Sequence, residues 1–227
     1  MTKKAVLIHG LHVEANGWDS LVWGDLAQNV WGSIPRGVEA AWRDQVELIF
    51  WGSGASSRDG KKEAEVMYER ALSGIGELAA LCDTSPEDLK AFLEARSVKD
   101  VDAKDTAAEI RDCFDLCLTR GIPSVVLIPY ASQAPIASRR ALGLALEDEK
   151  YASFRHHISL EPSDTRYAGT SMSDIVIFAP PHRGDRVSNP SHVLARKTLD
   201  VIQRLSKAGD ADGIEKLLAD WNSLLDR

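Results

Sequence analysis

The chain has 227 residues, and 27 Lys and Arg against 34 Asp and Glu give it a formal net charge of −7 at pH 7. That length fits one domain of ordinary size with a substantial core. The negative charge argues against general binding to nucleic acids or anionic membranes. No apolar stretch approaches the roughly 20 residues that span a bilayer, and the start lacks a signal-peptide core. We therefore expect a soluble, cytoplasmic protein.

Four runs of apolar, mostly β-branched residues break into small or polar residues, and a helical pattern follows each run. They are Ala5 to Gly10, Val46 to Gly54, Val125 to Ser132 and Ile175 to His182. Runs this apolar are typical of strands buried on both faces of a parallel sheet. Together with a further strand around 157–160, they predict one three-layer α/β domain over residues 1–227, with a mostly parallel sheet of about five strands.

Caps and periodicity predict the helices of the first half of the chain. A helix over about 20–31 follows the first run, with Asp19 or Ser20 as its N-cap, and a short connection through Pro35 and Gly37 leads to the second run. Helical spacing continues over about 61–81. Ser85 and the proline after it then start a helix that runs to about Arg96.

The second half of the chain continues the same alternation. Residues 97–104 form a predicted charged loop, and Asp105 or Thr106 starts a helix that ends before Gly121. Further helices are predicted over about 134–147, 191–208 and 214–225. The three cysteines lack a metal-ligand pattern, which indicates reduced thiols, partly buried.

The segments that follow the strands form the predicted site, because ligands of parallel sheets bind beyond the carboxyl ends of the strands. The loop after the second run is the richest, since small residues let a ligand approach the backbone close to the start of the next helix. It is neither a Walker A motif nor a dinucleotide fingerprint, and a flexible surface loop is the alternative interpretation. Its predicted ligand-binding residues are Ser53, Gly54, Ser56, Arg58 and Glu63.

The third run is followed by Ser132 and Gln133 and then, within the next helix, by Arg139 and Arg140. Guanidinium groups at this position would bind a phosphate or a carboxylate at two points. Pairing with surface acids is the alternative for either arginine alone. We predict that the loops after the first three runs meet at one pocket.

His9, His12 and His182 follow the first and fourth runs. If those strands are neighbours, the imidazoles would face one cleft and act as acid, base or metal ligand near neutral pH. A structural hydrogen bond is the alternative for each histidine. We take His12 and His182 as the catalytic candidates and predict no metal site.

The order of these motifs resembles the YdcF-like family, the SanA and ElyC group, over about residues 5–146. The resemblance is carried by the Ser-Gly loop, Lys62-Glu63-Ala64-Glu65-Val66-Met67, Glu94-Ala95-Arg96-Ser97, Asp105-Thr106-Ala107-Ala108-Glu109, and Ser132 with Arg140-Ala141. It implies a Rossmann-like fold with a site that includes Gly10, Ser53, Gly54, Glu63, Thr106, Ser132 and Arg140. It also implies binding of a nucleotide-like ligand or S-adenosylmethionine, and envelope-related roles.

Three features depart from that family. The first strand ends in His9-Gly10-Leu11-His12 instead of a glycine run, and Ala137 stands where the family has a His before its Arg-Ala pair. The membrane anchor of the envelope members is also missing. We therefore expect a soluble offshoot whose chemistry does not use the family's His.

The expected function is that of a small-molecule enzyme, a hydrolase or a transferase, acting on a metabolite with a phosphate, nucleotide or carboxylate group. The expected partner is that ligand, with neither nucleic acid nor membrane, and homo-oligomer formation is left open. One alternative is an α/β-hydrolase that uses Ser132 with Asp164 or Asp174 and His182, although Tyr130 does not suit a nucleophile elbow. The other alternative is a non-catalytic sensor on the same fold.

Overall fold

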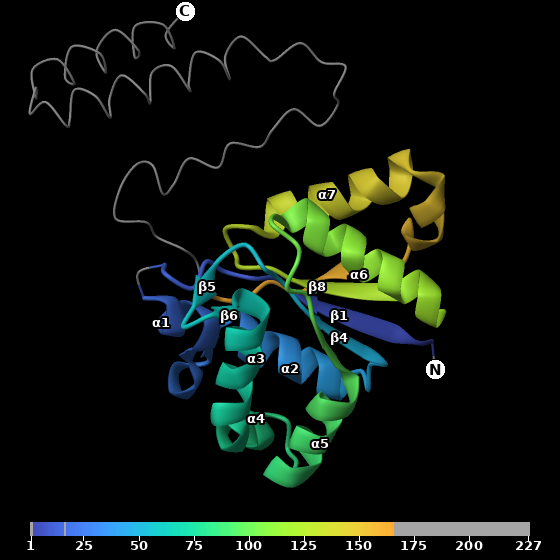
Figure 1. Cartoon of the computed structure of the whole chain (residues 1–227). Coiled ribbons are helices and arrows are strands. Elements are labelled where there is room, and N and C mark those ends of the chain that lie inside the picture. Colours follow the sequence, from blue (N-terminus) through green and yellow to red (C-terminus); the bar gives the residue numbers. More distant parts are fainter. Residues whose placement is uncertain (1, 16, 166–227) are drawn as a thin grey trace, which may run out of the picture. The chain divides into compact units, whose positions relative to one another are not determined.

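The centre of the protein is a five-stranded sheet in which all strands are parallel, in the order β7-β4-β1-β8-β9. The computed structural model describes residues 2–15 and 17–165, all within one compact unit. The strands of the sheet are β1 (Lys4–Ile8), β4 (Leu48–Trp51), β7 (Ser97–Lys99), β8 (Ser124–Ile128) and β9 (Ile158–Leu160). Helices flank the sheet on both faces (Figure 1), which confirms the predicted three-layer, Rossmann-like α/β fold.

The two faces of the sheet carry different helices. One face is covered by α2 (Ser33–Arg43), α3 (Glu63–Ser73), α4 (Ile75–Leu81) and α5 (Pro86–Arg96), and the other by α6 (Thr106–Arg120) and α7 (Ala134–Glu147). Because side chains alternate along β1, Val6 and Ile8 point into the core on the α2 side of the sheet, and Ala5 and Leu7 point into the core on the α6 side. Burial on both faces explains why the strands read as continuous apolar runs.

The order of the strands reverses beside β1. The chain passes from β1 to β4 and then to β7, and it returns through α6 to β8 on the opposite side of β1. In folds of this class, ligands bind at the carboxyl ends of the two strands between which the direction changes. A ligand of this protein is therefore expected beside the segments after β1 and β8.

The helix predicted over about residues 20–31 is wrong at both ends, because its N-cap is Gly17 instead of Asp19 or Ser20 and it ends at Trp23. Helix α1 covers only Trp18–Trp23, and the chain continues as β2 (Gly24–Asp25), the 3-10 helix η1 (Leu26–Gln28) and β3 (Val30–Trp31). Gly24 has a φ of 82°, which ends the helix, and Asn29 has a φ of 56° within the turn between β2 and β3. Both are residue types that tolerate the left-handed region.

The connection predicted through Pro35 and Gly37 is also wrong, because both residues lie inside α2. Pro35 occupies the first turn, where its missing N–H breaks no helical bond. A Cβ on Gly37 would lie 2.5 Å from the side chain of Ile8, so glycine here allows the helix to pack against β1. Close packing thus overrides the low helix propensity of these two residues.

The loop predicted over 97–104 contains β7, which pairs with β4 at the edge of the sheet. This strand has only three residues, one of them a lysine, and is therefore too short and too polar to show the pattern of a buried strand. The helix predicted over about 61–81 is divided at Gly74 into α3 and α4.

The remaining helices and strands predicted within the described residues are confirmed. Ser85 caps α5, Asp105 caps α6, and Gly121 ends α6 in the left-handed region. Helix α7 and strand β9 lie where they were predicted, and the shorter elements η2 (Glu149–Phe154), β5 (Ser57–Arg58) and β6 (Lys61–Lys62) complete the unit. The fourth apolar run, the two C-terminal helices and the single domain over 1–227 lie partly or wholly outside the described residues and stay predictions.

Cysteine reactivity tests the packing of these layers. Cys113 and Cys117 are fully buried in the core beneath α6, and burial raises the pKa of the Cys113 thiol well above its usual value. Burial also raises the pKa of Cys82 to about 12, with a smaller contribution from Glu39. Because only the thiolate reacts, we expect thiol-specific disulfide reagents at pH 8 to modify the native protein about 100-fold more slowly than the urea-unfolded chain. Rapid labelling of Cys113 or Cys117 in the native protein would contradict the packing around α6.

Candidate functional site

A cluster of buried polar side chains lies at the carboxyl ends of β1 and β4. It comprises His9, Ser53, Ser56, Glu63 and Glu109, none of which is more than 9% exposed. These residues come from the end of β1, the loop after β4, the start of α3 and the first turns of α6. Because burying polar groups is costly unless they are paired, the partners of each side chain indicate what the cluster does.

His9 pairs with a carboxylate on its Nδ1 side. It follows β1 directly, and side-chain alternation places it on the α6 face, as for Leu7. Its Nδ1 lies 2.6 Å from Oε2 of Glu109, and the backbone N–H of Gly10 donates to Oε1 of Glu109 at 3.3 Å. A carboxylate in this position orients the imidazole and leaves Nε2 as the atom available for proton transfer.

The other ring nitrogen of His9 is buried and has no hydrogen-bond partner among the described residues. Buried polar atoms in folded proteins are almost always paired, so each exception requires a physical explanation. His9 also lies at the strand reversal, since its backbone N–H donates to the carbonyl of Ile128, the last residue of β8. An unpaired donor or acceptor at this position is what a ligand site requires.

Glu63 forms a second network, which is complete. Its Oε2 accepts a hydrogen bond from Ser53 Oγ and its Oε1 accepts one from Ser56 Oγ, each at 2.5 Å. Ser56 Oγ also accepts from the backbone N–H of Val13 at 2.9 Å. The two serine hydroxyls therefore donate to Glu63 and are not free to donate to a ligand in this structure.

Gly10 lies between the two networks. A Cβ on this residue would be 2.6 Å from Oε2 of Glu63 and 2.6 Å from the backbone nitrogen of Ser53. On its other side, the Gly10 N–H contacts Glu109. The predicted site residue Gly10 therefore has a packing role, because a side chain would separate the carboxylates from the strand end.

The segment after β8 contributes further buried polar atoms. Gln133 Oε1 and Arg140 Nε are both buried without a partner among the described residues. Gln133 is the N-cap of α7, and Arg140 lies seven residues further along, on the same side of that helix. Burial raises the pKa of the Tyr130 hydroxyl, which accepts a hydrogen bond from Ser33 at 2.9 Å and stays neutral near pH 7.

The structure does not bring all of the predicted residues into the cluster. His12, Arg58 and Arg139 are exposed, whereas Thr106 and Ser132 are half-buried. Arg58 donates to the Val13 carbonyl and lies 4.9 Å from the centre of the Trp18 ring. Because β4 and β8 both neighbour β1, the loops after these three strands share one edge of the sheet.

The alternative hydrolase triad, with Ser132 as its nucleophile, is not assembled within the described part of the chain. Asp164 accepts hydrogen bonds from the Trp31 N–H at 2.9 Å and from Arg36 at 3.0 Å, and not from a histidine. The other two members, Asp174 and His182, lie outside the described residues.

Sequence reasoning missed Glu109 as a site residue and did not favour His9 over His12. A signal for Glu109 was present: it occupies the buried face of an amphipathic helix together with Ile110, Cys113, Phe114 and Cys117. An acid on such a face is rarely left without a partner.

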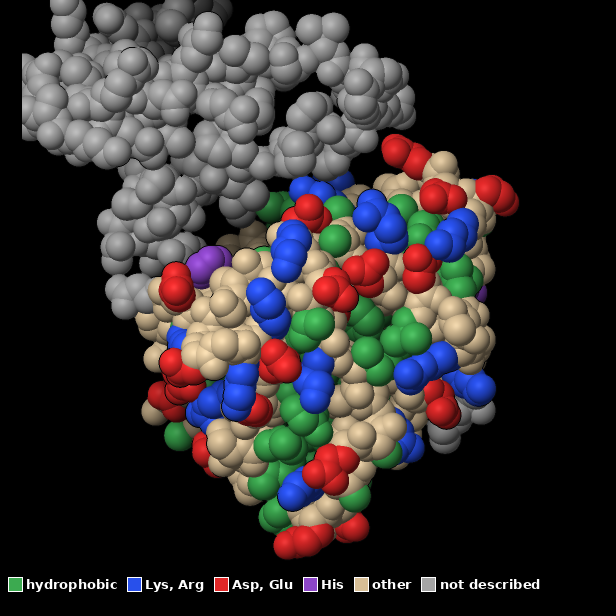
Figure 2. Space-filling view, viewed as in Figure 1, with side chains coloured by type: hydrophobic (Ala, Val, Ile, Leu, Met, Phe, Trp, Pro, Cys, Tyr) green, Lys and Arg blue, Asp and Glu red, His purple; other side chains and the backbone are tan. Residues whose placement is uncertain are grey.

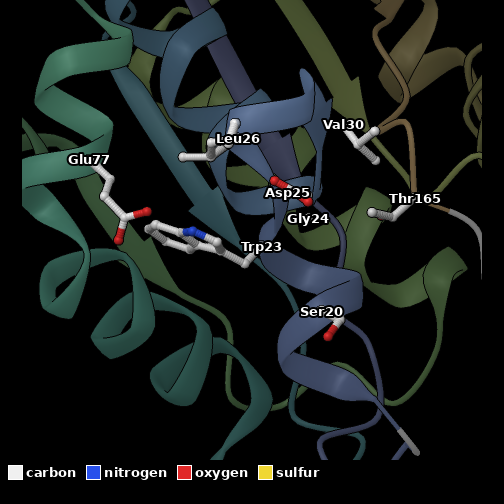
Figure 3. Close-up of a pocket in the computed structure, with 9 residues that line it drawn as sticks. Ser20, Trp23, Gly24, Asp25, Leu26, Val30, Glu77 and Thr165 are labelled. Carbon is white, nitrogen blue, oxygen red and sulfur yellow. The ribbon is translucent and has the colours of Figure 1, made fainter.

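A separate pocket of about 490 Å³ shares no residue with this cluster. Figure 3 shows the carboxylate of Glu77 beside the Trp23 ring, with Leu26 and Asp25 on the neighbouring segment. The full lining consists of Ser20, Trp23, Gly24, Asp25, Leu26, Ala27, Val30, Glu77 and Thr165. This lining contains no histidine and no nucleophile paired with a base, so we place the candidate site at the buried cluster.

On the face shown in Figure 2, the basic and acidic side chains of the described residues are interspersed. None of the described helices combines the length and the apolar character needed to cross a bilayer. Within residues 2–15 and 17–165, no group of three or more His, Cys, Asp or Glu side chains could hold a metal ion.

Neither a protein-family model, nor a curated protein, nor a solved structure matches the chain significantly. The resemblance to the YdcF-like family therefore stays a prediction, and function has to be inferred from the geometry of the site.

Proposed function

We propose that the chain is an enzyme that acts on a small polar metabolite beyond the carboxyl ends of β1 and β8, with His9 as its proton-transfer group. One observation carries this proposal: the buried His9–Glu109 pair, with Nε2 of His9 unpartnered among the described residues, lies where the strand order reverses. A structural histidine would use both ring nitrogens. His9 replaces His12 as the favoured proton-transfer candidate, because His12 is exposed.

The charges around the site orient the metabolite. Glu63 and Glu109 make the β4 side of His9 unfavourable for a phosphate or a carboxylate, while Arg140 on α7 has a buried Nε that no other described residue pairs with. The anionic group of the ligand would therefore bind toward α7, with its hydroxyl or leaving group at His9. Such a placement suits a hydrolase or a transferase, in which the imidazole takes a proton from the attacking hydroxyl or gives one to the leaving group.

Glu109 supports this chemistry in two ways. By accepting a hydrogen bond from Nδ1–H, it keeps the proton off Nε2 in the neutral imidazole, so that Nε2 can accept one. It also stabilises the imidazolium formed during transfer, as the carboxylate of a catalytic triad does.

S-adenosylmethionine, which the family resemblance implies, does not fit the two buried carboxylates beside Gly10. Adenosine cofactors on folds of this class are commonly held by a carboxylate that accepts ribose hydroxyls. Both oxygens of Glu63 already accept serine hydroxyls, and both oxygens of Glu109 contact His9 or Gly10. We therefore assign no step to this cofactor.

The proposal is tested by adding ATP, p-nitrophenyl phosphate, citrate or S-adenosylmethionine to protein labelled with ¹⁵N histidine. We expect at least one anionic compound to shift the His9 Nε2 resonance. Removing a charge contact should cost about 1.5–3 kcal/mol, so Arg140→Ala should weaken that binding by about 10- to 100-fold. The matched control is Arg139→Ala, because its neighbour Arg139 is exposed.

Two results would count against the proposal. Binding that leaves the His9 resonances unchanged would remove His9 from the site. Equal effects of the two arginine variants would show that the anion is held by surface charge rather than at α7. Binding at His9 without turnover of any bound compound would instead favour the sensor alternative.

A further inference from the structure

The loop after β1 is hydrogen-bonded to the segment after β4. Val13 lies in this loop, its side chain is fully buried, and its N–H donates to Ser56 Oγ at 2.9 Å. Its carbonyl accepts a hydrogen bond from Arg58, so both polar groups of the Val13 backbone bond to the segment after β4. Two strand-end loops that are separate in sequence are thereby joined.

Glu63 anchors the loop after β4 through two serines, one of which holds Val13. Its Oε1 accepts from Ser56, which holds Val13, and its Oε2 accepts from Ser53, the second residue after β4. The backbone N–H groups of Glu63 and Ala64 bond in turn to the carbonyls of Ser56 and Ser53, at 3.3 and 3.0 Å. The start of α3 and the loop after β4 therefore form one hydrogen-bonded unit.

That unit contacts the His9 pair through Gly10. Oε2 of Glu63 and the Ser53 nitrogen each lie 2.6 Å from where a Cβ of Gly10 would be, and the Gly10 N–H donates to Glu109, the partner of His9. A displacement of Glu63 would move Gly10 and, with it, the residue that precedes it. Of the two buried carboxylates, Glu109 would act through His9, whereas Glu63 has no free oxygen for a ligand.

We infer that Glu63 is a positioning residue: through Ser53, Ser56 and Gly10 it fixes the loops after β1 and β4 and thereby sets the position of the His9 imidazole. This inference rests on the proposed function of His9. The carboxylate at this position accepts from both serine hydroxyls at once. A glutamine would offer one acceptor oxygen and an NH₂ group, which cannot accept a hydrogen bond.

The experiment compares Glu63→Gln and Ser56→Ala with the matched control Glu69→Gln, using the ligand-free full chain. Glu69 lies on the same helix but is exposed and pairs with Lys61. The first measurement is amide hydrogen exchange at Val13, and the second is the ¹⁵N chemical shifts of the His9 imidazole. Circular dichroism checks that each variant is folded.

We expect both cluster variants to raise the Val13 exchange rate by about tenfold, the upper end of the usual effect of losing one hydrogen bond between neutral groups. Both should also move the His9 shifts, which a local loss of stability around Val13 would not do. Glu69→Gln should change neither quantity. If Glu63→Gln does not fold, Ser56→Ala still breaks the link between Glu63 and Val13 while leaving the carboxylate in place.

Unchanged Val13 exchange in folded Glu63→Gln and Ser56→Ala would overturn the inference, and so would faster exchange with unchanged His9 shifts. Neither measurement uses a ligand or turnover. A failure of this inference is therefore distinct from a failure of the proposed function, which would appear as ligand binding that leaves His9 unperturbed.

Discussion

Replacing His9 by asparagine is expected to slow turnover of a substrate found by ligand screening by about 10²–10⁴-fold, the usual effect of losing a general acid or base. Asparagine keeps a side-chain amide near the position of Nδ1, so Glu109 retains a hydrogen-bond partner. It has no atom at the position of Nε2, the ring nitrogen without a partner in the described structure. Steady-state kinetics with purified, folded protein provides the measurement.

The matched control is the same substitution at His12, which is exposed and three residues further along the chain. His12→Asn should leave turnover within about twofold of the unchanged protein, because an exposed side chain makes few oriented contacts. Glu109→Gln should retain more activity than His9→Asn, since it disturbs the orientation of the imidazole and leaves Nε2 in place. A large loss in His12→Asn, with His9→Asn unaffected, would restore the expectation drawn from sequence.

The location of the buried polar cluster was predictable because it depends on a local pattern. Apolar runs that end in small and polar residues marked the carboxyl ends of β1 and β4, and the sheet brings Gly10, Ser53, Ser56 and Glu63 together there. Parallel strands always present these ends at the same edge, so strand prediction alone was sufficient for this part.

The partners within the site were not predictable in the same way. Glu109 is 100 residues from His9, and their contact depends on α6 covering the same face of β1 toward which His9 points. The choice between His9 and His12 depends on where β1 ends, because one residue of difference reverses the side of the sheet on which a side chain lies. Sequence patterns define the ends of elements less sharply than that.

The helices likewise divide into those that local sequence signals predict and those that depend on tertiary packing. Helices α5 and α6 carry strong local caps in Ser85 and Asp105, and both lie as predicted. Helix α2 instead contains a proline and a glycine, and it forms because Gly37 allows it to pack closely on Ile8. Tertiary packing of this kind leaves no signature in local propensity.

Substituting alanine for Gly54 is expected to destabilise the protein by about 3 kcal/mol, the upper end of the usual cost of overpacking. A Cβ at this position would lie 1.8 Å from the carbonyl oxygen of Val101 and 2.3 Å from its carbonyl carbon. Both are backbone atoms, so no side-chain rotation relieves the clash. The loop cannot easily withdraw either, because the Gly54 N–H donates to Ala103 at 2.9 Å and its carbonyl accepts from Lys104 at 2.8 Å.

Urea unfolding followed by circular dichroism measures this cost, and Gly76→Ala is its matched control. Gly76 lies in α4, and a Cβ there would meet nothing within 4 Å, so alanine should stabilise the protein by about 0.4–1 kcal/mol through its higher helix propensity and the reduced freedom of the unfolded chain. Opposite signs for the two substitutions would show that the loop after β4 packs directly against the 101–104 segment. If Gly54→Ala were as stable as the unchanged protein, the two segments would have to lie further apart in solution, and Gly54 would be available to a ligand as the sequence predicted.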